Sequence, residues 1–447
     1  MLRGFKLKHA LALAWPISLQ GMLTNFISIV DVAMVSHLGD SAIAAVGLGN
    51  RYQFMLMVIL LGCAWTVGVL SAQYYGAEQT SRIRSTIVLA CAVALLGLLP
   101  VALLTWFWSI NIIGLATNNI DVIQLGSEYI NITVPSLAFV AVILVYENAI
   151  RSLGHTKLPL IMSAVAIALN IALNYWFIHG GLGLPAMGVL GAALATAAAR
   201  LIQLLLLISF IHINQHPLRT RLEDFRPNRK EAWKIISMAA PMMGSFGVWA
   251  VGIFVYQLIY GNMGTTELAI IAMLTPVEAI FLALFFGLSS ACSISIGQRL
   301  GANDFTGAIV QARVFIMLNI SIAVLLGIVL TLCAPLVLAP FASSDTGNLA
   351  YAHKVLILMA LLSWLKVSNM TLAMGVLRAG GDNRIVMLID VVGMWFIGIP
   401  LTAAAALIWH WPLLAVVAIA YSEELSKVIL FAWRVLQKHW LKNLSLH

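Results

Sequence analysis

Charged residues are scarce in this sequence. Of its 447 residues only 9% are charged, whereas 62% are hydrophobic, and the mean hydropathy is +0.98. Because a soluble globular domain carries about 25% charged residues, this composition excludes an ordinary soluble protein. It indicates an integral membrane protein that crosses the lipid bilayer several times.

Motifs of catalysis and metal binding are also missing. The four cysteines all lie in apolar stretches, and none has the spacing of a metal site. The ten histidines lie mostly in loops and termini, without an H-E-x-x-H motif. An enzyme working inside a membrane would need clustered catalytic groups. We therefore expect no enzyme activity, no metal and no cofactor.

Long apolar stretches fill the chain instead. A transmembrane helix needs about 20 mostly apolar residues, and the sequence predicts twelve such helices. The expected spans are 11–36, 46–75, 85–108, 124–150, 158–179, 188–212, 235–260, 267–296, 309–336, 352–376, 385–408 and 411–436. The first apolar run is longer than that of a signal peptide and lacks a cleavage site, so we interpret it as the first transmembrane helix.

The net charge of +8 has a topological explanation. Most of the 25 Lys and Arg residues lie at the two termini, in the central loop and after the even-numbered spans. Because basic residues gather on the cytoplasmic side of a membrane protein, we expect both termini in the cytoplasm. This distribution explains the basic excess without a nucleic-acid partner.

The two halves of the chain repeat one pattern. Pro16 recurs as Pro241 and Gly62 as Gly287, in each case 225 residues further on. Duplicated helical bundles are typical of transporters that work by alternating access. We therefore expect an all-α protein of two pseudo-symmetric six-helix bundles. The predicted domains are an N-terminal lobe (1–212), a cytoplasmic linker (213–234) and a C-terminal lobe (235–447).

A polar group of residues stands out in the first half. Asp31, Tyr129, Asn170 and Asn174 lie within about two helical turns of one another in expected depth, near the outer side of the membrane. Asn170 and Asn174 share one helix face because residues i and i+4 align. Three of the four matching positions in the second half are apolar, so we predict a polar pocket in the first half. Hydrogen bonding that merely joins helices is the alternative.

Of this group, Asp31 has the highest free-energy cost of burial in a membrane. An ionised carboxylate near the bilayer centre costs a few kcal/mol or more, and a neutral residue would join helices more cheaply. A carboxyl group in a poorly solvated place also holds a proton more readily than one in water. We therefore predict that Asp31 takes up and releases a proton, and that it attracts a cation when charged.

Pro16 lies on the same expected helix, before Asp31. A proline removes one backbone hydrogen bond and kinks a helix. Our hypothesis is that Pro16 is a hinge, at which the first helix bends when Asp31 is protonated. A static kink is the alternative.

The chain resembles the multidrug and toxic compound extrusion (MATE) family, and most closely its DinF-like branch. The motifs are "LAWP" (13–16), "SHLGDSAIAAVGLG" (36–49), "GAEQTSRI" (76–83), "RSLGHTK" (151–157), "LRAGGDNR" (377–384) and "WFIGIP" (395–400). The resemblance spans essentially the whole chain. It implies a V-shaped pair of six-helix lobes in the bacterial inner membrane, acting as a monomer. It also implies export of cationic, amphipathic compounds by antiport.

The resemblance also implies roles for the polar group. The first lobe of that branch carries an Asp on helix 1, a Tyr on helix 4, and an Asn and an Asp on helix 5, which match Asp31, Tyr129, Asn170 and Asn174. Asn174 departs from the pattern, because a second carboxylate is expected there. This favours proton coupling by Asp31 alone. A Na⁺-coupled exporter and a flippase of lipid-linked precursors remain the alternatives.

Carboxylates of the second half are secondary candidates, because other branches use acids there. Glu278 has no obvious partner in the sequence, whereas we expect Asp390 to pair with Lys366. An intrahelical pair is expected between Glu423 and Lys427, which are spaced i, i+4. Two further acids are expected at the cytoplasmic ends of helices, against solvent or loops: Glu147 and Asp382.

Overall fold

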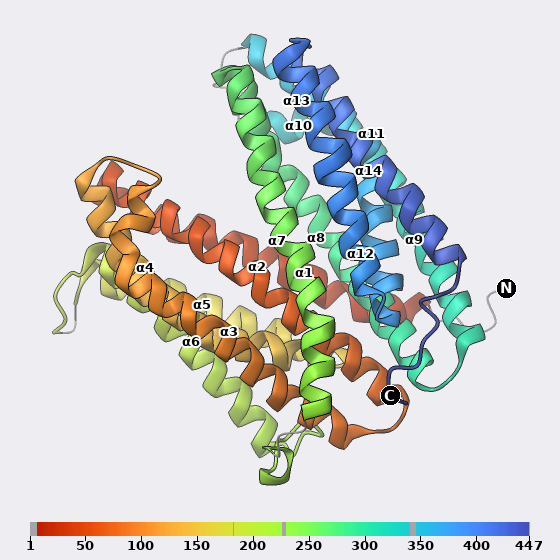
Figure 1. The fold of residues 1–447 in the computed structure, drawn as a ribbon. Coiled ribbons are helices and arrows are strands. Elements are labelled where there is room, and N and C mark those ends of the chain that lie inside the picture. Colours follow the sequence, from red (N-terminus) through yellow and green to blue (C-terminus); the bar gives the residue numbers. More distant parts are fainter. Residues whose placement is uncertain (1–6, 182, 226–228, 340–345, 447) are drawn as a thin grey trace. The chain divides into compact units, whose positions relative to one another are not determined.

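The computed structural model describes residues 7–181, 183–225, 229–339 and 346–446. Within these ranges the chain is helical apart from turns, short loops and one isolated β-bridge between Gly181 and Leu184 (Figure 1). The all-α prediction is therefore confirmed.

The helices follow the order of the expected spans. In the first half they are α1 (Leu7–Val35), α2 (Asp40–Gly76), α3 (Thr80–Gly114), α4 (Ile120–Ser152), α5 (Lys157–His179) and α6 (Gly188–Ile213). In the second half they are α7 (Arg229–Met263), α8 (Thr265–Gly301), α9 (Phe305–Leu332), α10 (Ala334–Leu338), α11 (Thr346–Met370), α12 (Asn383–Val391), α13 (Ile399–Ala403) and α14 (Leu413–Leu436). Three segments with π-helical hydrogen bonding, η4 (Thr371–Leu377), η6 (Val392–Gly398) and η7 (Ala404–Ile408), extend or join the last helices.

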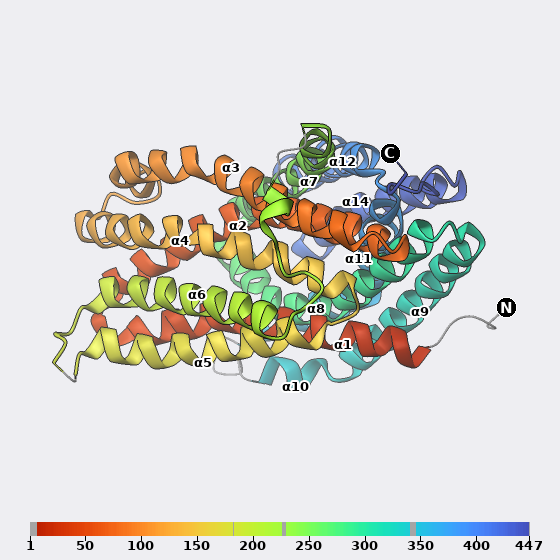
Figure 2. The same cartoon turned by 90° about the horizontal axis from the view of Figure 1, so that it is seen from below.

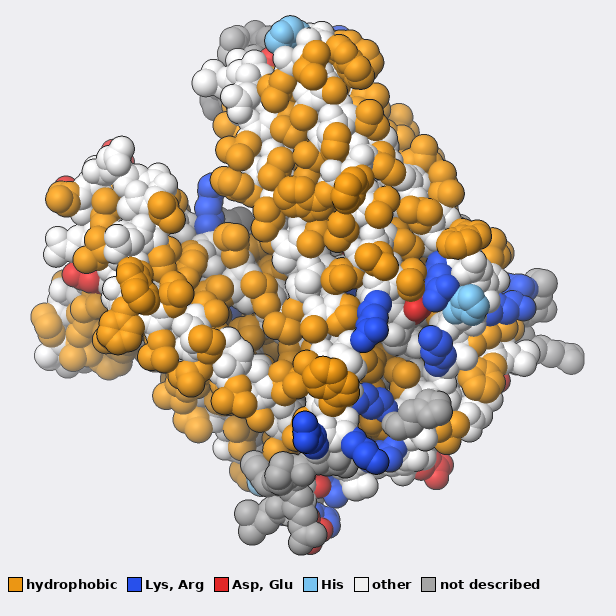
Figure 3. Space-filling view, viewed as in Figure 1, with side chains coloured by type: hydrophobic (Ala, Val, Ile, Leu, Met, Phe, Trp, Pro, Cys, Tyr) orange, Lys and Arg blue, Asp and Glu red, His pale blue; other side chains and the backbone are white. Residues whose placement is uncertain are grey.

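Ten helical stretches of the described residues are long and apolar enough to cross a bilayer. The two other expected spans correspond to α1, whose apolar part is Ala10–Thr24, and to α14, which carries Glu423, Glu424 and Lys427. On the face drawn in Figure 3, hydrophobic side chains cover large areas, and most Lys and Arg side chains gather in the lower part. The chain is therefore a multi-pass membrane protein.

The chain forms two compact units. The N-terminal unit is Leu19–Met243, and the C-terminal unit combines Met1–Ser18 with Gly244–His447. These boundaries fall inside α1 and α7, whereas the sequence predicts a domain boundary in the loop between the two halves (213–234). In the N-terminal unit, α6 packs against both α4 and α5 (Figure 2).

The internal duplication is visible in how α1 and α7 pack. The boundary after Ser18 and the boundary after Met243 lie 225 residues apart, as the repeated residues do. In the C-terminal unit, Gly287 of α8 lies against the backbone of α1, and the Ser18 hydroxyl donates a hydrogen bond to the Leu284 carbonyl (2.7 Å). In the N-terminal unit, Gly62 of α2 lies against the backbone of α7 in the same way. The two glycines therefore recur because each lets two helices approach closely.

We expect Gly287→Ala and Gly62→Ala to destabilise the fold. A Cβ at Gly287 would lie 2.5 Å from the Ala14 carbonyl oxygen, and one at Gly62 would lie 2.6 Å from the Met243 nitrogen. Overpacking of this kind costs about 1–3 kcal/mol, so the melting temperature in detergent should fall. Gly97→Ala is the control, since no atom lies within 4 Å of its added Cβ. Equal melting of all three variants would refute the close-approach argument.

Candidate functional site

A small cavity with several polar side chains in its walls lies in the N-terminal unit. Its volume is about 80 Å³, and its walls come from α1, α2, α5 and α6. The lining residues are Thr24, Asp31, Asn50, Gln53, Phe54, Met57, Ala166, Asn170, Thr196, Ala199 and Arg200. Most of them are polar or charged, which is rare inside a membrane and marks a candidate functional site.

Asp31 is held by a chain of amide side chains. Its side chain is buried (6% exposed), and its Oδ1 accepts a hydrogen bond from Asn174 Nδ2 at 2.8 Å. The same Asn174 nitrogen donates to Asn170 Oδ1 at 3.1 Å, and Asn170 Nδ2 donates to Thr196 Oγ1 at 3.3 Å. The structure thus places three of the four predicted pocket residues in one hydrogen-bonded row.

Tyr129 lies beside this row rather than in it. Its hydroxyl donates a hydrogen bond to Asn50 Oδ1 at 2.8 Å, and Asn50 lines the cavity. The ring is fully enclosed between helices and packs closely against Gly49 of α2. Tyr129 therefore helps to fix Asn50, which lines the same cavity as Asp31.

The row leaves one hydrogen-bond acceptor open. Oδ1 of Asn174 is buried and has no partner among the described residues. Asn174 Nδ2 faces Asp31 and donates to its carboxylate, so Asn174 would accept from a protonated Asp31 only after its amide group rotates. Because an unpaired buried carbonyl costs roughly 1–3 kcal/mol, this site favours the arrival of a donor.

Arg200 of α6 is the cationic residue of this cavity. It lines the same space as Asp31. Its Nη1 donates a hydrogen bond to Gln203 Oε1 at 3.0 Å. Asp31 therefore has a neutral amide as its hydrogen-bond donor and a cation at longer range.

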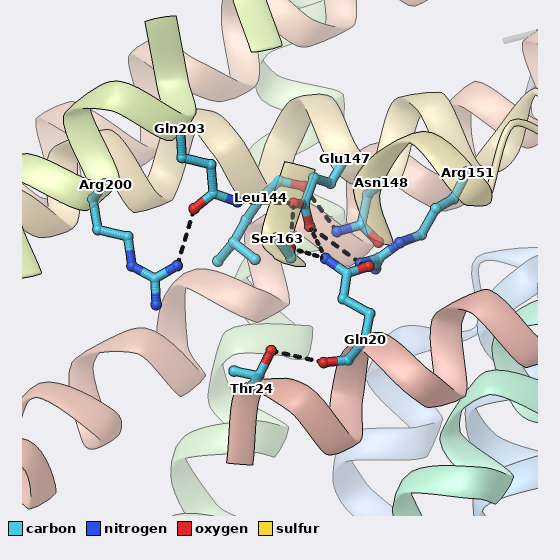
Figure 4. Close-up of polar contacts among 9 residues, drawn as sticks. All are labelled: Gln20, Thr24, Leu144, Glu147, Asn148, Arg151, Ser163, Arg200 and Gln203. Atoms are coloured by element: carbon cyan, nitrogen blue, oxygen red, sulfur yellow. Dashed lines mark hydrogen bonds and ion pairs between the residues drawn. The ribbon is translucent and has the colours of Figure 1, made fainter. Parts of the chain in front are cut away.

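The same unit contains a second buried acid (Figure 4). Glu147 of α4 is only 2% exposed, so the expectation of a solvated helix end is wrong. Its carboxylate accepts hydrogen bonds from Gln20 (2.9 Å), Arg151 (3.1 Å), Ser163 (3.4 Å) and Gln203 (3.4 Å). The spacing of Glu147 and Arg151, i and i+4 on one apolar helix, is the sequence signal that points to this cluster.

The acids of the C-terminal unit are paired with bases, in a different pattern from the expected one. Lys366 of α11 donates to Glu278 of α8, so the expectations that Glu278 has no partner and that Lys366 pairs with Asp390 are both wrong. Asp390 instead accepts from Ser245 and lies 3.7 Å from Arg378 and 3.8 Å from Lys427.

Two other acids of this unit also have basic partners. Glu423 and Lys427 form the predicted i, i+4 pair at 2.5 Å. Asp382 pairs with Arg434 at 2.6 Å and is buried, so its expected solvated position is wrong. Bases thus lie close to Glu278, Asp382, Asp390 and Glu423 in the C-terminal unit, whereas the Asp31 carboxylate accepts its hydrogen bond from an amide.

Two repeated helical halves with a buried carboxylate beside a cavity are features of a membrane transporter. The MatE family model matches residues 16–176 and 241–404, one segment in each half. The chain therefore belongs to the MatE family, which is a family of transporters and not of enzymes.

Individual relatives cover nearly the whole chain. A protein of Photorhabdus laumondii described as probable multidrug resistance protein NorM is 24% identical over 90% of this chain and 88% of its own length. A crystal structure of MATE in the bent conformation has a TM-score of 0.88, 17% identity, and covers 100% of this chain and 98% of its own. One in the straight conformation has a TM-score of 0.85, 18% identity, and covers 97% and 96%. These structures show the fold, and the predicted MATE architecture is confirmed.

Proposed function

We propose that this protein is an antiporter that exports cationic, amphipathic compounds in exchange for protons. The observation that carries the proposal is the Asp31 carboxylate, which is buried in the wall of a small cavity and has a neutral amide as its hydrogen-bond donor. A carboxylate without a directly bonded base changes its charge more easily than one in an ion pair. The relative named as a multidrug resistance protein supports the substrate class.

The proposed cycle uses the two states of this carboxyl group. Charged Asp31 accepts from Asn174 and attracts a cationic substrate that enters from the cytoplasm. After export, a proton from the outer side neutralises Asp31. The carrier then returns, and release of the proton to the cytoplasm restores the charged carboxylate. Each ligand drives the cycle only by its different affinity for the two conformations.

We place the protein in the bacterial inner membrane as a monomer, with both termini in the cytoplasm. The distribution of Lys and Arg supports this orientation. A flippase of lipid-linked pyrophosphates would need uncompensated bases to bind its substrate. Lys366, Arg378 and Lys427 each face a carboxylate, which favours the antiporter.

Imposing a gradient of either protons or sodium ions across a membrane identifies the coupling ion. In proteoliposomes loaded with a cationic dye, we expect an imposed pH gradient to drive export and a sodium gradient at constant pH to drive none. Transport driven by sodium alone would refute proton coupling and favour the Na⁺-coupled alternative.

The predicted hinge lies where α1 passes from one compact unit to the other. Pro16 is buried and comes two residues before the boundary at Ser18, and Pro241 of α7 comes two residues before the matching boundary at Met243. A proline at this point leaves α1 without one backbone hydrogen bond, which makes bending cheaper. The bent and straight conformations named for two similar structures support this reading.

We expect Pro16→Ala to slow transport several-fold without unfolding the protein, because alanine restores the missing hydrogen bond and stiffens α1. Distances between spin labels at the two ends of α1 should change with pH in the wild type and much less in the variant. Pro241→Ala is the matched comparison in the other repeat. An α1 path that is the same at high and low pH in the wild type would rule out the hinge.

A further inference from the structure

Arg200 is linked to two buried acids of the N-terminal unit. On one side it lines the cavity that also contains Asp31. On the other side, its hydrogen bond to Gln203 (3.0 Å) continues through Gln203 Nε2 to Glu147 Oε1 (3.4 Å), as Figure 4 shows. Neither contact is a direct ion pair, so the guanidinium charge acts on both carboxylates at longer range. One positive charge is therefore shared by two negative groups.

The hydrogen bond of this guanidinium goes to a neutral side chain. Gln203 is its partner, so its charge is free to respond to whichever carboxylate is ionised. Glu147, in contrast, is anchored by its own base, since Arg151 of α4 lies 3.1 Å from it. Glu147 therefore has two cations nearby, Arg151 and Arg200. For Asp31, Arg200 is the basic residue that lines its cavity.

We propose that Glu147 is a positioning residue that sets the proton affinity of the coupling carboxylate by competing with Asp31 for Arg200. The proposal rests on the proposed function of Asp31. When Asp31 is charged, its field holds Arg200 at the cavity. When Asp31 takes a proton, Arg200 is attracted toward Glu147, and the network around Glu147 tightens.

The groups that face Glu147 come from four helices. Arg151 lies on α4 itself, Gln20 on α1, Ser163 on α5 and Gln203 on α6. Gln20 donates to Glu147 and also accepts from Arg151 Nη2 at 2.6 Å. It lies one helical turn after Pro16, so a change at this network reaches the predicted hinge.

A purely structural role is the competing explanation. A buried, hydrogen-bonded Glu–Arg pair can simply hold four helices together. In that case the charge of Glu147 would matter for stability and would leave the protonation of Asp31 unaffected. The two explanations differ in the pH at which Asp31 titrates.

The test is a pH titration of the carboxyl groups by infrared difference spectroscopy, on the full-length protein in lipid. The carbonyl band that disappears in Asp31→Asn reports the protonation of Asp31 without any substrate. We expect Glu147→Gln to shift its midpoint downward by about half to one pH unit, because Arg200 then serves Asp31 alone. We expect Arg200→Gln to shift it upward, and Arg200→Lys to stay near the wild type.

The double variant decides between the two explanations. If Arg200 transmits the effect, adding Glu147→Gln to Arg200→Gln should shift the midpoint by less than half of the shift seen in the wild-type background. An unchanged midpoint in Glu147→Gln, or an equal shift in both backgrounds, would overturn the proposal. Absence of an Asp31 band that titrates would instead contradict the proposed function. Melting temperatures of all variants exclude unfolding as the cause.

Discussion

Asp31→Asn is expected to reduce proton-driven export to the level of vesicles without protein. The amide has nearly the shape of the carboxyl group, so the cavity and its hydrogen bonds should persist. The amide cannot attract a cationic substrate, which the binding step needs. It also cannot take up a proton, which the return step needs. The measurement is uphill dye export from proteoliposomes under an imposed pH gradient.

The matched control is Asp121→Asn. Asp121 is exposed in the first turn of α4, so the same substitution changes net charge equally without touching the cavity. We expect its export rate to equal that of the wild type. Uphill export that survives in Asp31→Asn would show that another group carries the proton. Glu278 and Asp390 would then be tested next by the same assay.

The helices could be predicted from the sequence because their signal is local. An apolar run of sufficient length can satisfy its backbone in lipid only as a helix, so each of the expected spans has a counterpart in the structure. The duplication was also visible, in pairs such as Gly62 and Gly287. Its physical cause, close approach to the backbone of α7 and α1, needed the structure.

The partners of the buried charges could not be predicted in the same way. The pair of Glu423 and Lys427 was found because both lie on one helix face. Lys366 and Glu278 lie on different helices, 88 residues apart, and the sequence does not say which helix faces they share. The sequence favours Asp390 as the partner of Lys366, which the structure contradicts.

The burial of Glu147 could not be predicted either. Its position near the end of an apolar helix favours contact with solvent, because the sequence shows depth along one helix and not the neighbouring helices. In the structure, residues from α1, α5 and α6 close around it. The identity of the Asp31 neighbourhood was predictable because Asn170 and Asn174 repeat at helical spacing. The link from Arg200 through Gln203 was not, since its far end lies on another helix.

The largest effect on stability is expected for Lys427→Met. Lys427 is buried and lies 2.5 Å from Glu423 and 3.8 Å from Asp390, so its removal leaves two carboxylates of the C-terminal unit with less compensation. Removing one partner of a buried ion pair costs about 3–5 kcal/mol. The melting temperature in detergent should therefore fall well below that of the wild type.

The double variant Glu423→Gln/Lys427→Met separates lost charge compensation from lost packing. The introduced glutamine keeps an oxygen that can accept from the Tyr256 hydroxyl, which bonds to Glu423 in the wild type at 2.5 Å, while it removes the unpaired charge. Most of the lost stability should return, because neutral replacement of a whole buried pair is often nearly neutral. Arg299→Met is the surface comparison: its pair with Asp304 is 30% and 44% exposed, and such pairs contribute about 1 kcal/mol or less. If the double variant melted no higher than Lys427→Met, the loss would come from packing of the lysine stem and not from its charge.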